Sequence, residues 1–149
     1  MDAPVDLGPE VPPRWEHFEH VGEVGIRGLG NTLEQAFEQA ALAMTAVIAD
    51  PASVRPLKPV PINCRSSDRE LLLVDWLNAL VFEMASRRML FGRFEVQIVG
   101  HQLAATAWGE PVDPSRHHPE VKVKGATLLD LRASRDAQGQ WIAQCIVDV

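Results

Sequence analysis

Two segments with a helical repeat of apolar residues, separated by a proline-rich connector, constrain the fold of this chain more than any other feature. The first follows a capping-box pattern at residues 32–35, and apolar residues then recur at helical spacing until a proline ends the pattern. The second follows another capping box at residues 67–70. These patterns predict amphipathic helices over residues 32–49 and 68–87.

Segments with strand character flank these helices instead of alternating with them regularly. Residues 93–99 and 102–108 alternate in polarity around Gly100-His101, which is typical of a hairpin. Further strands are expected over residues 15–28, 59–64, 120–132 and 141–149. Because runs of strands interrupt the helices, the sequence predicts an α+β fold and not a parallel α/β sheet.

The order of the elements indicates that one unit is inserted into another. A strand-helix-strand-strand unit over residues 56–108 interrupts a second such unit, formed by residues 15–50 and 120–149. We therefore expect two nested modules whose mixed or antiparallel sheets are packed by the two helices. A single domain over residues 14–149 fits the chain length, which allows one sizeable core.

The N-terminal segment and the cysteines bear on the compartment. Residues 1–13 are acidic and rich in proline, which favours a disordered tail, and they have neither the basic start nor the apolar run of a signal peptide. No apolar segment approaches the ~20 residues of a membrane span. Cys64 and Cys145 form no CxxC pair, so two reduced thiols and no disulfide are expected. The sequence thus indicates a cytoplasmic protein with no membrane contact.

The charge balance argues against a protein that binds nucleic acid by itself. Acidic residues outnumber basic ones by 20 to 14, and the largest basic clusters are Arg87-Arg88 and the pair Lys122 and Lys124. Proteins that bind phosphate backbones normally show a basic face, so a partner would have to hold any RNA. The chain also lacks a phosphate-binding glycine loop and a nucleophile signature, which argues against an enzyme.

Acidic residues near both ends of the chain form the candidate metal site. The stretch from Trp15 to Gly30 combines two histidines with several acids, and such acids cost energy in a short buried element unless a positive group meets them. We expect Glu23 and Asp148 to bind a divalent cation, Ca²⁺ or Mg²⁺, with an oxygen of Val149 as a third ligand. The alternative is that Glu23 is a solvated edge residue and Asp148 a fraying terminal acid.

Three further residues are expected beside this site or at a partner surface. His20 is adjacent to Glu23 in the same strand pattern and would orient a carboxylate or cap a backbone group. His117 lies in a polar loop, where a solvated side chain and a partner contact are both open. Lys124 shares one strand face with Lys122 and would contact an acidic partner or a phosphate.

Several motifs in a fixed order resemble the archease family. Residues 30–37, GNTLEQAF, resemble G-x-T-L-E-E-A-F, and residues 71–80 resemble its tryptophan-containing helix. Residues 109–117 match G-E-x-x-D-x-x-x-H, residues 123–127 match V-K-A-x-T, and the final strand matches the closing motif. The resemblance covers nearly the whole chain after residue 14 and implies a fold of one such module inserted in another.

The resemblance also implies a function. Archease promotes the guanylylation and turnover of an RtcB-type RNA ligase, which joins RNA ends through a guanylylated histidine with GTP and a divalent metal, in tRNA splicing or RNA repair. On this basis the chain is a non-catalytic activator whose partner is the ligase and which meets RNA only indirectly.

Two positions depart from the family pattern. Glu23 stands where the family has a metal-binding aspartate in H-T-A-D, and Leu128-Leu129 stand where it has Tyr-His. Both departures favour an alternative function, a small-ligand-binding or protein-docking module that has lost the metal. Glutamate is one methylene longer than aspartate, so a cation site can also persist with a shifted ion.

Overall fold

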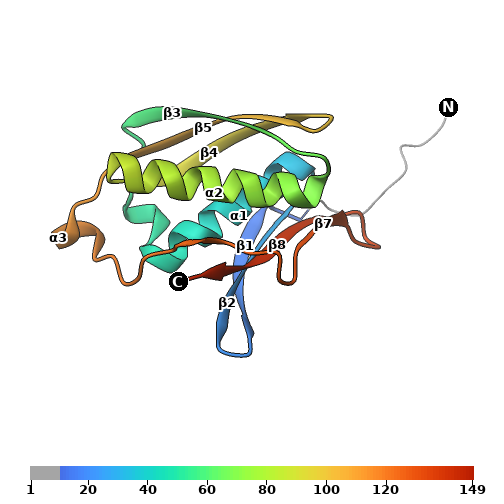
Figure 1. The fold of residues 1–149 in the computed structure, drawn as a ribbon, viewed down its shortest axis with the longest axis horizontal. Coiled ribbons are helices and arrows are strands. Elements are labelled where there is room, and N and C mark those ends of the chain that lie inside the picture. Colours follow the sequence, from blue (N-terminus) through green and yellow to red (C-terminus); the bar gives the residue numbers. More distant parts are fainter. Residues whose placement is uncertain (1–10) are drawn as a thin grey trace.

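The computed structural model describes residues 11–149 and confirms an α+β fold. The described chain has three α-helices, α1 (Leu33–Ile48), α2 (Arg69–Arg87) and the short α3 (Pro114–His117), and one 3-10 turn, η1 (Pro51–Ser53). Its strands form two antiparallel sheets, which lie above and below the two long helices in Figure 1.

The two sheets are built from different parts of the chain. The first contains β1 (Arg14–His20), β2 (Glu23–Gly30), β8 (Trp141–Asp148) and β6 (Gly125–Ala126) in that order, with β7 (Arg132–Arg135) also paired to β8. The second has the order β3 (Lys58–Arg65), β5 (Gln102–Pro111) and β4 (Met89–Val99). The strands of the second sheet thus lie, in sequence, between those that form the first.

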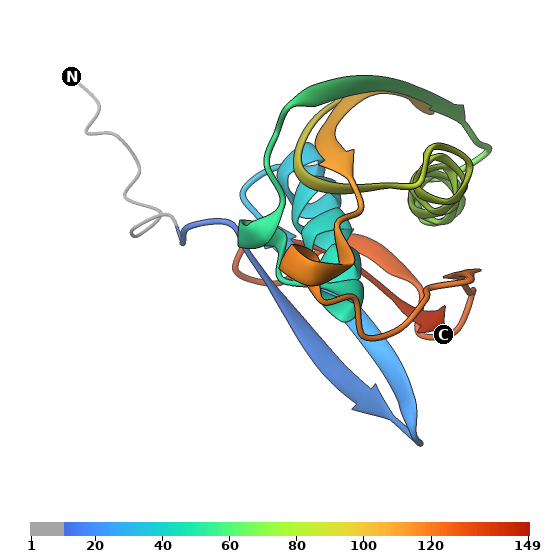
Figure 2. The ribbon, with the colours of Figure 1, turned by 90° about the vertical axis from the view of Figure 1, so that its left-hand side faces the viewer.

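Helix α1 lies at the centre of the molecule and contacts both sheets, as Figure 2 shows. It packs on β2 and β8 on one side and on β4 on the other, with Phe37 and Met44 fully buried. The approach to β2 is very close: a Cβ atom on Gly28 would lie 2.2 Å from the Ala36 carbonyl oxygen. Glycine at position 28 is therefore required for this packing.

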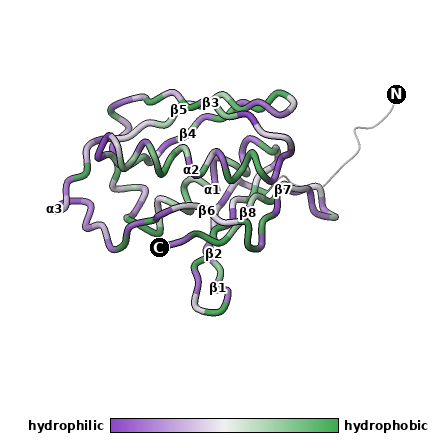
Figure 3. The backbone as a smooth tube through the Cα atoms, viewed as in Figure 1, coloured by the Kyte–Doolittle hydropathy of each residue, from purple (hydrophilic) through white to green (hydrophobic). Residues whose placement is uncertain are grey.

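Helix α2 packs beside α1 and buries its own apolar side against β3. The Trp76 side chain is fully buried, donates a hydrogen bond to the Phe37 carbonyl oxygen at 3.1 Å and meets Phe94 edge to face. Along both helices apolar residues alternate with polar ones, as the hydropathy colours in Figure 3 show. This is the pattern of helices with one face in a core.

Both long helices begin and end within one residue of the predicted bounds, and their caps explain why. Thr32 caps α1, because its hydroxyl accepts a hydrogen bond from the Gln35 amide at 3.1 Å. In α2 the capping residue is Asp68, whose carboxylate accepts from the Leu71 amide at 2.8 Å. The prediction of Ser67 as the start of the second capping box was therefore wrong by one residue.

The prediction of one strand over residues 15–28 is wrong, because the chain reverses at Val21-Gly22 and forms the β1–β2 hairpin. Both turn residues have positive φ, 48° and 80°, which is the conformation of a tight two-residue hairpin turn. The end of this hairpin extends beyond the rest of the molecule in Figures 1 and 2. It is the most protruding part of the described chain.

Other strands are also shorter or longer than expected. The segment over residues 120–132 holds only the two-residue strand β6 and the start of β7, whereas the hairpin of β4 and β5 is longer than predicted. Strands β6 and β7 are short because each pairs only with β8, at one edge of the first sheet. The α3 turn was not predicted, although Asp113 caps it and Pro114 begins it.

The remaining expectations concern the tail, the thiols and the membrane. The expected tail lies mostly outside the described residues, and residues 11–13 belong to no helix or strand. Cys64 and Cys145 are both free, and burial raises the pKa of the Cys145 thiol to about 12, so this thiol stays protonated. Within residues 11–149, no helix is long and apolar enough to cross a membrane.

Candidate functional site

The candidate metal ligands lie at the end of the β2–β8 strand pair. Val24 pairs with Val147 in this antiparallel register, so the next step along the two strands sets Glu23 opposite Asp148. Both residues are exposed, and Val149 follows with about half of its surface exposed. The register therefore puts two carboxylates, from positions 125 residues apart in sequence, at one exposed strand end.

His20 lies between two carboxylates at this end of the sheet. Its Nδ1 atom is 3.7 Å from a Glu23 oxygen, and its Nε2 atom is 3.6 Å from an oxygen of Asp130. Both separations are longer than a hydrogen bond, and Nδ1 has no partner although this atom is buried. His20 thus accompanies the carboxylates as expected, but the contacts are loose.

Sequence reasoning missed Asp130. It lies in a turn with φ of 50°, and its carbonyl oxygen accepts a hydrogen bond from the Gln144 side chain on β8 at 3.1 Å. A non-glycine residue in this region is most often Asn or Asp, but no local motif linked the position to Glu23. Asp130 is the second of the two carboxylates that lie near His20.

The donor set at this end suits a hard cation only in part. Glu23, Asp148 and the main-chain oxygens of Val149 are oxygen donors, the ligands that Ca²⁺ and Mg²⁺ prefer. Across residues 11–149, however, no three His, Cys, Asp or Glu side chains are gathered closely enough to hold a metal ion. A cation here would be held by two carboxylates, main-chain oxygens and water.

The surface around these acids carries a lysine and several apolar side chains. Lys124 is exposed, and its amide donates to the Asp148 carbonyl oxygen at 2.7 Å, so it lies next to the acidic end. Val21 at the hairpin turn is 92% exposed, and Leu128 and Leu129 are also largely exposed. Apolar side chains exposed beside charged ones are typical of a surface that meets a partner.

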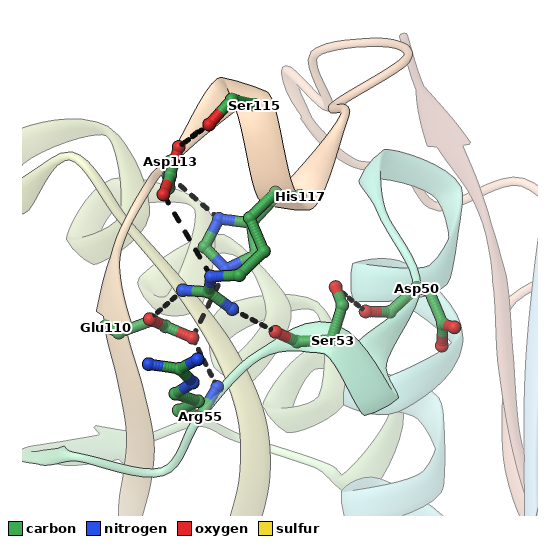
Figure 4. Close-up of polar contacts among 8 residues, drawn as sticks. Asp50, Ser53, Arg55, Glu110, Asp113, Ser115 and His117 are labelled. Carbon is green, nitrogen blue, oxygen red and sulfur yellow. Dashed lines mark hydrogen bonds and ion pairs between the residues drawn. The ribbon is translucent and has the colours of Figure 1, made fainter.

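His117 belongs to a different cluster, which is buried and fully hydrogen-bonded, as Figure 4 shows. Its side chain is completely buried; Nδ1 accepts from the Asp113 amide at 2.9 Å, and Nε2 lies 3.2 Å from the Glu110 carboxylate. This arrangement assigns the ring hydrogen to Nε2, which donates to Glu110. The burial of His117 shows that its side chain is not solvated in this structure, in contrast to the interpretation as a solvated loop histidine.

Glu110 is the centre of this cluster. Its carboxylate accepts from the Arg55 amide at 2.5 Å, pairs with the Arg116 guanidinium and meets His117. Burial alone would raise the pKa of Glu110, but these donors outweigh it and lower the pKa to about 2. Arg116 also donates to the Ser53 carbonyl oxygen at 2.7 Å, so the cluster ties β5, α3 and η1 together.

A buried carboxylate and histidine can serve as an acid–base pair, but this pair is not arranged for it. Both ring nitrogens of His117 are occupied by contacts inside the protein, and every described partner of Glu110 is also a protein group. No atom of the pair is left to reach a substrate. The cluster is therefore structural.

The fold and the exposed strand end together define a class: a small α+β protein with two sheets around two helices, which presents carboxylates beside a protruding hairpin. Residues 15–149 match the Archease protein family (MTH1598/TM1083). The chain belongs to this family, and the resemblance found in the sequence is confirmed.

Relatives match this chain over nearly their full lengths. The chain is 36% identical to the "Protein archease" of Pyrococcus abyssi over 140 residues, which cover 91% of this chain and 99% of the relative. It is 34% identical to the "Protein archease" of Methanosarcina acetivorans over 146 residues, or 95% and 99% of the two chains. The solution structure of Methanobacterium thermoautotrophicum protein 1598 has the same fold, with a TM-score of 0.79, 31% identity and coverage of 91% and 98%.

Proposed function

We propose that this protein is a non-catalytic activator of an RtcB-type RNA ligase, which promotes guanylylation and turnover of the ligase in tRNA splicing or RNA repair in the cytoplasm. The observation that carries this proposal is membership of the archease family over residues 15–149. The protein would act through a divalent cation, Ca²⁺ or Mg²⁺, held by Glu23, Asp148 and Val149 at the exposed strand end.

The shape of the molecule supports this mechanism. The β1–β2 hairpin protrudes beyond the body, and the carboxylates lie at the base of its turn, where β8 ends. Carboxylates at a small protruding end can enter a cleft of a larger enzyme, whereas carboxylates at the centre of a flat sheet cannot. Here Glu23 and Asp148 would hold and position the ion, while Lys124 and His20 would lie at the edge of the contact.

A second candidate function is a docking or small-ligand module that has lost the metal. The long contacts of His20 and the absence of three gathered ligating side chains in residues 11–149 favour it. An apolar cavity of about 220 Å³ between the end of α2 and residues 119–123 offers such a module a place for a ligand. Cation binding distinguishes the two candidates.

The functional test is a guanylylation assay of the cognate ligase with and without this protein. We expect Asp148→Ala and Glu23→Gln to lose most of the stimulation while the fold is retained, because both side chains are exposed. The matched control is Glu70→Gln, which removes an acid at the start of α2. Its neighbour Arg69 stacks on Trp141, at the end of β8 opposite to Asp148, so Glu70 is not part of the candidate site. If both site variants stimulate the ligase as well as wild type does, the cation mechanism is wrong.

A cation titration, followed by thermal unfolding, tests the ligands without the ligase. Binding to the folded state alone stabilises it by RT ln(1 + [L]/Kd), about 1.4 kcal/mol at roughly ten times Kd. Ca²⁺ or Mg²⁺ should raise the Tm of wild type and of Glu70→Gln, but not that of Asp148→Ala. Glu23→Asp should bind at least as tightly as wild type, since it restores the usual family ligand. A Tm that no divalent cation changes would favour the second candidate.

A further inference from the structure

The outer face of the second sheet is a regular surface that no described helix covers. In Figures 1 and 2 both long helices lie on the inner side of β3, β5 and β4, and the outer side faces solvent. Strand alternation puts every second residue on this outer face. They are Pro59, Pro61, Asn63 and Arg65 of β3; Gln102, Ala104, Thr106 and Trp108 of β5; and Arg93, Glu95, Gln97 and Val99 of β4.

The charge on and around this face is opposite to that of the whole chain. The face itself carries Arg65 and Arg93 against a single acid, Glu95. Exposed Arg55, Lys58 and Arg88 lie at the end of the sheet where β3 and β4 begin. The chain as a whole has a net charge of −6, whereas this face carries two arginines and one glutamate and is locally positive; Glu110 and Asp113 lie near the basic residues at its end.

An aromatic platform lies beside these basic residues. Trp108 is in the central strand and only partly buried, and the Arg93 guanidinium carbon lies 4.7 Å from the centre of its ring. The other contact of Arg93 is an exposed ion pair with Glu95 at 3.0 Å, which contributes little and breaks easily. Nucleic-acid bases stack on both tryptophan rings and guanidinium planes.

Further along the face, a shallow cavity of about 360 Å³ has a mixed lining, with four polar residues and with Cys64, Val99, Leu103 and Ala104. Asn63, Gln97 and Gln102 supply amide donors and acceptors, Arg65 supplies charge, and the small Ala104 is in the central strand. Such amides recognise base edges by hydrogen bonds. Ala104 and Trp108 are four residue steps apart along β5, a distance of about 14 Å in a strand.

We propose that this outer face binds a short single-stranded RNA segment directly, with one base stacked on the Arg93–Trp108 pair and a second, non-adjacent base of the same segment in the shallow cavity. The basic residues at the start of β3 and β4 would contact its phosphates. From the sequence, we expected that only a partner could hold RNA. The sequence did not reveal this face because its basic residues are scattered along the chain and come together only when the strands pair. This binding requires no ligase, so it is independent of the function proposed above.

The test is fluorescence anisotropy of a labelled uridine 12-mer with the isolated protein at several salt concentrations. For single-stranded nucleic acid, the logarithm of the binding constant falls by about 0.7 per phosphate contact for each tenfold rise in salt concentration. Three contacts therefore predict a slope of about −2 in a plot of log K against log salt. Trp108→Ala should weaken binding about 10-fold, within the range of one stacked base. Arg88→Gln, directly before the start of β4, should weaken it by less and reduce the salt slope by about 0.7.

Two variants elsewhere in the molecule serve as matched controls. Trp15→Ala removes an exposed tryptophan from β1, and Arg135→Gln removes an exposed arginine from β7, both in the other sheet. Neither should change the affinity. If Trp108→Ala does not fold, Trp108→Phe should retain most of the affinity, and Arg65→Glu, at an exposed position, should remove it.

Three results would overturn the proposal. They are the absence of oligonucleotide binding by wild type at 100 µM protein, a loss that the two control variants share, and binding that Trp108→Ala and Arg65→Glu both leave unchanged. If wild type binds no RNA but Trp108→Ala weakens co-purification with the ligase, the face is a protein-docking surface and the RNA assignment is wrong.

Discussion

A histidine meets carboxylates at two places in this fold, and the two places differ in burial. His117 is fully buried against Glu110, with both ring nitrogens occupied at 2.9 and 3.2 Å. The His20 side chain is 41% exposed, and its nearest carboxylates lie 3.6 and 3.7 Å away. The same residue types thus form a closed structural cluster in one place and a loose, accessible group in the other. Only the second can still take a ligand.

The largest difference between these two places should appear in stability. His117→Ala removes a fully buried ring and takes one hydrogen-bond partner from Glu110 and one from the Asp113 amide, so we expect a loss of about 3 kcal/mol. His20→Ala removes no hydrogen bond and should change the stability by less than about 0.5 kcal/mol. Urea unfolding followed by circular dichroism measures both. Similar losses for the two variants would contradict the comparison.

The second prediction concerns the acid side of the buried cluster. The pKa of Glu110 is about 2 in the folded protein, well below the ordinary value of 4.5 that applies after unfolding. Its contribution to stability is therefore fully present above pH 4.5 and is lost as the pH falls from 4.5 towards 2. Glu110→Gln should be less stable than wild type at pH 7, and the gap should close over that range.

The measurement is urea unfolding of wild type and Glu110→Gln at pH 7, 4.5, 3 and 2. Asp113 and Glu16 also have lowered pKa values, so the stability of both proteins will fall with acid, and only the difference between them reports on Glu110. A difference that stays constant from pH 7 to pH 2 would show that the Glu110 carboxylate is not held in its charged form by the cluster.

The bounds of the helices, and the proximity of two acids that are distant in sequence, could be predicted from the sequence. Helix caps are local signals, so Thr32 and Asp68 fix the helix starts within one residue. The neighbourhood of Glu23 and Asp148 followed from a nested topology in which the first and last strands pair. These inferences succeeded because each depends on a few adjacent residues or on the order of elements.

The predictions that failed concern features that depend on contacts between segments, and sequence patterns do not link these segments. His117 is in a polar loop, and its burial arises only because α3 folds it onto Glu110 of β5. The hairpin turn was missed because valine is disfavoured where φ is positive, so Val21 continued the strand pattern in sequence. Asp130 reaches His20 through a turn that no motif marks.

The smallest predicted effect concerns Val21 at the turn of the exposed hairpin. Its φ of 48° puts a β-branched residue in the left-handed region, at a cost of about 1–2 kcal/mol, while its side chain is 92% exposed and buries little. Val21→Asn creates the Asn-Gly pair that this turn type favours, so we expect a gain of about 1 kcal/mol, or a Tm higher by about 2–4 °C. Val99→Asn is the matched control, because Val99 is 80% exposed and is not among the described residues with positive φ.

The same variant should stimulate the ligase less, since it removes a 92% exposed apolar side chain close to Glu23 in sequence. Stability and activity would then change in opposite directions, as expected where strain is retained for a contact. Thermal unfolding and the guanylylation assay, performed on the same preparations, measure the two effects. A Val21→Asn protein that is no more stable than wild type would show that the turn is not strained. One that is more stable and fully active would place the ligase contact elsewhere on the hairpin.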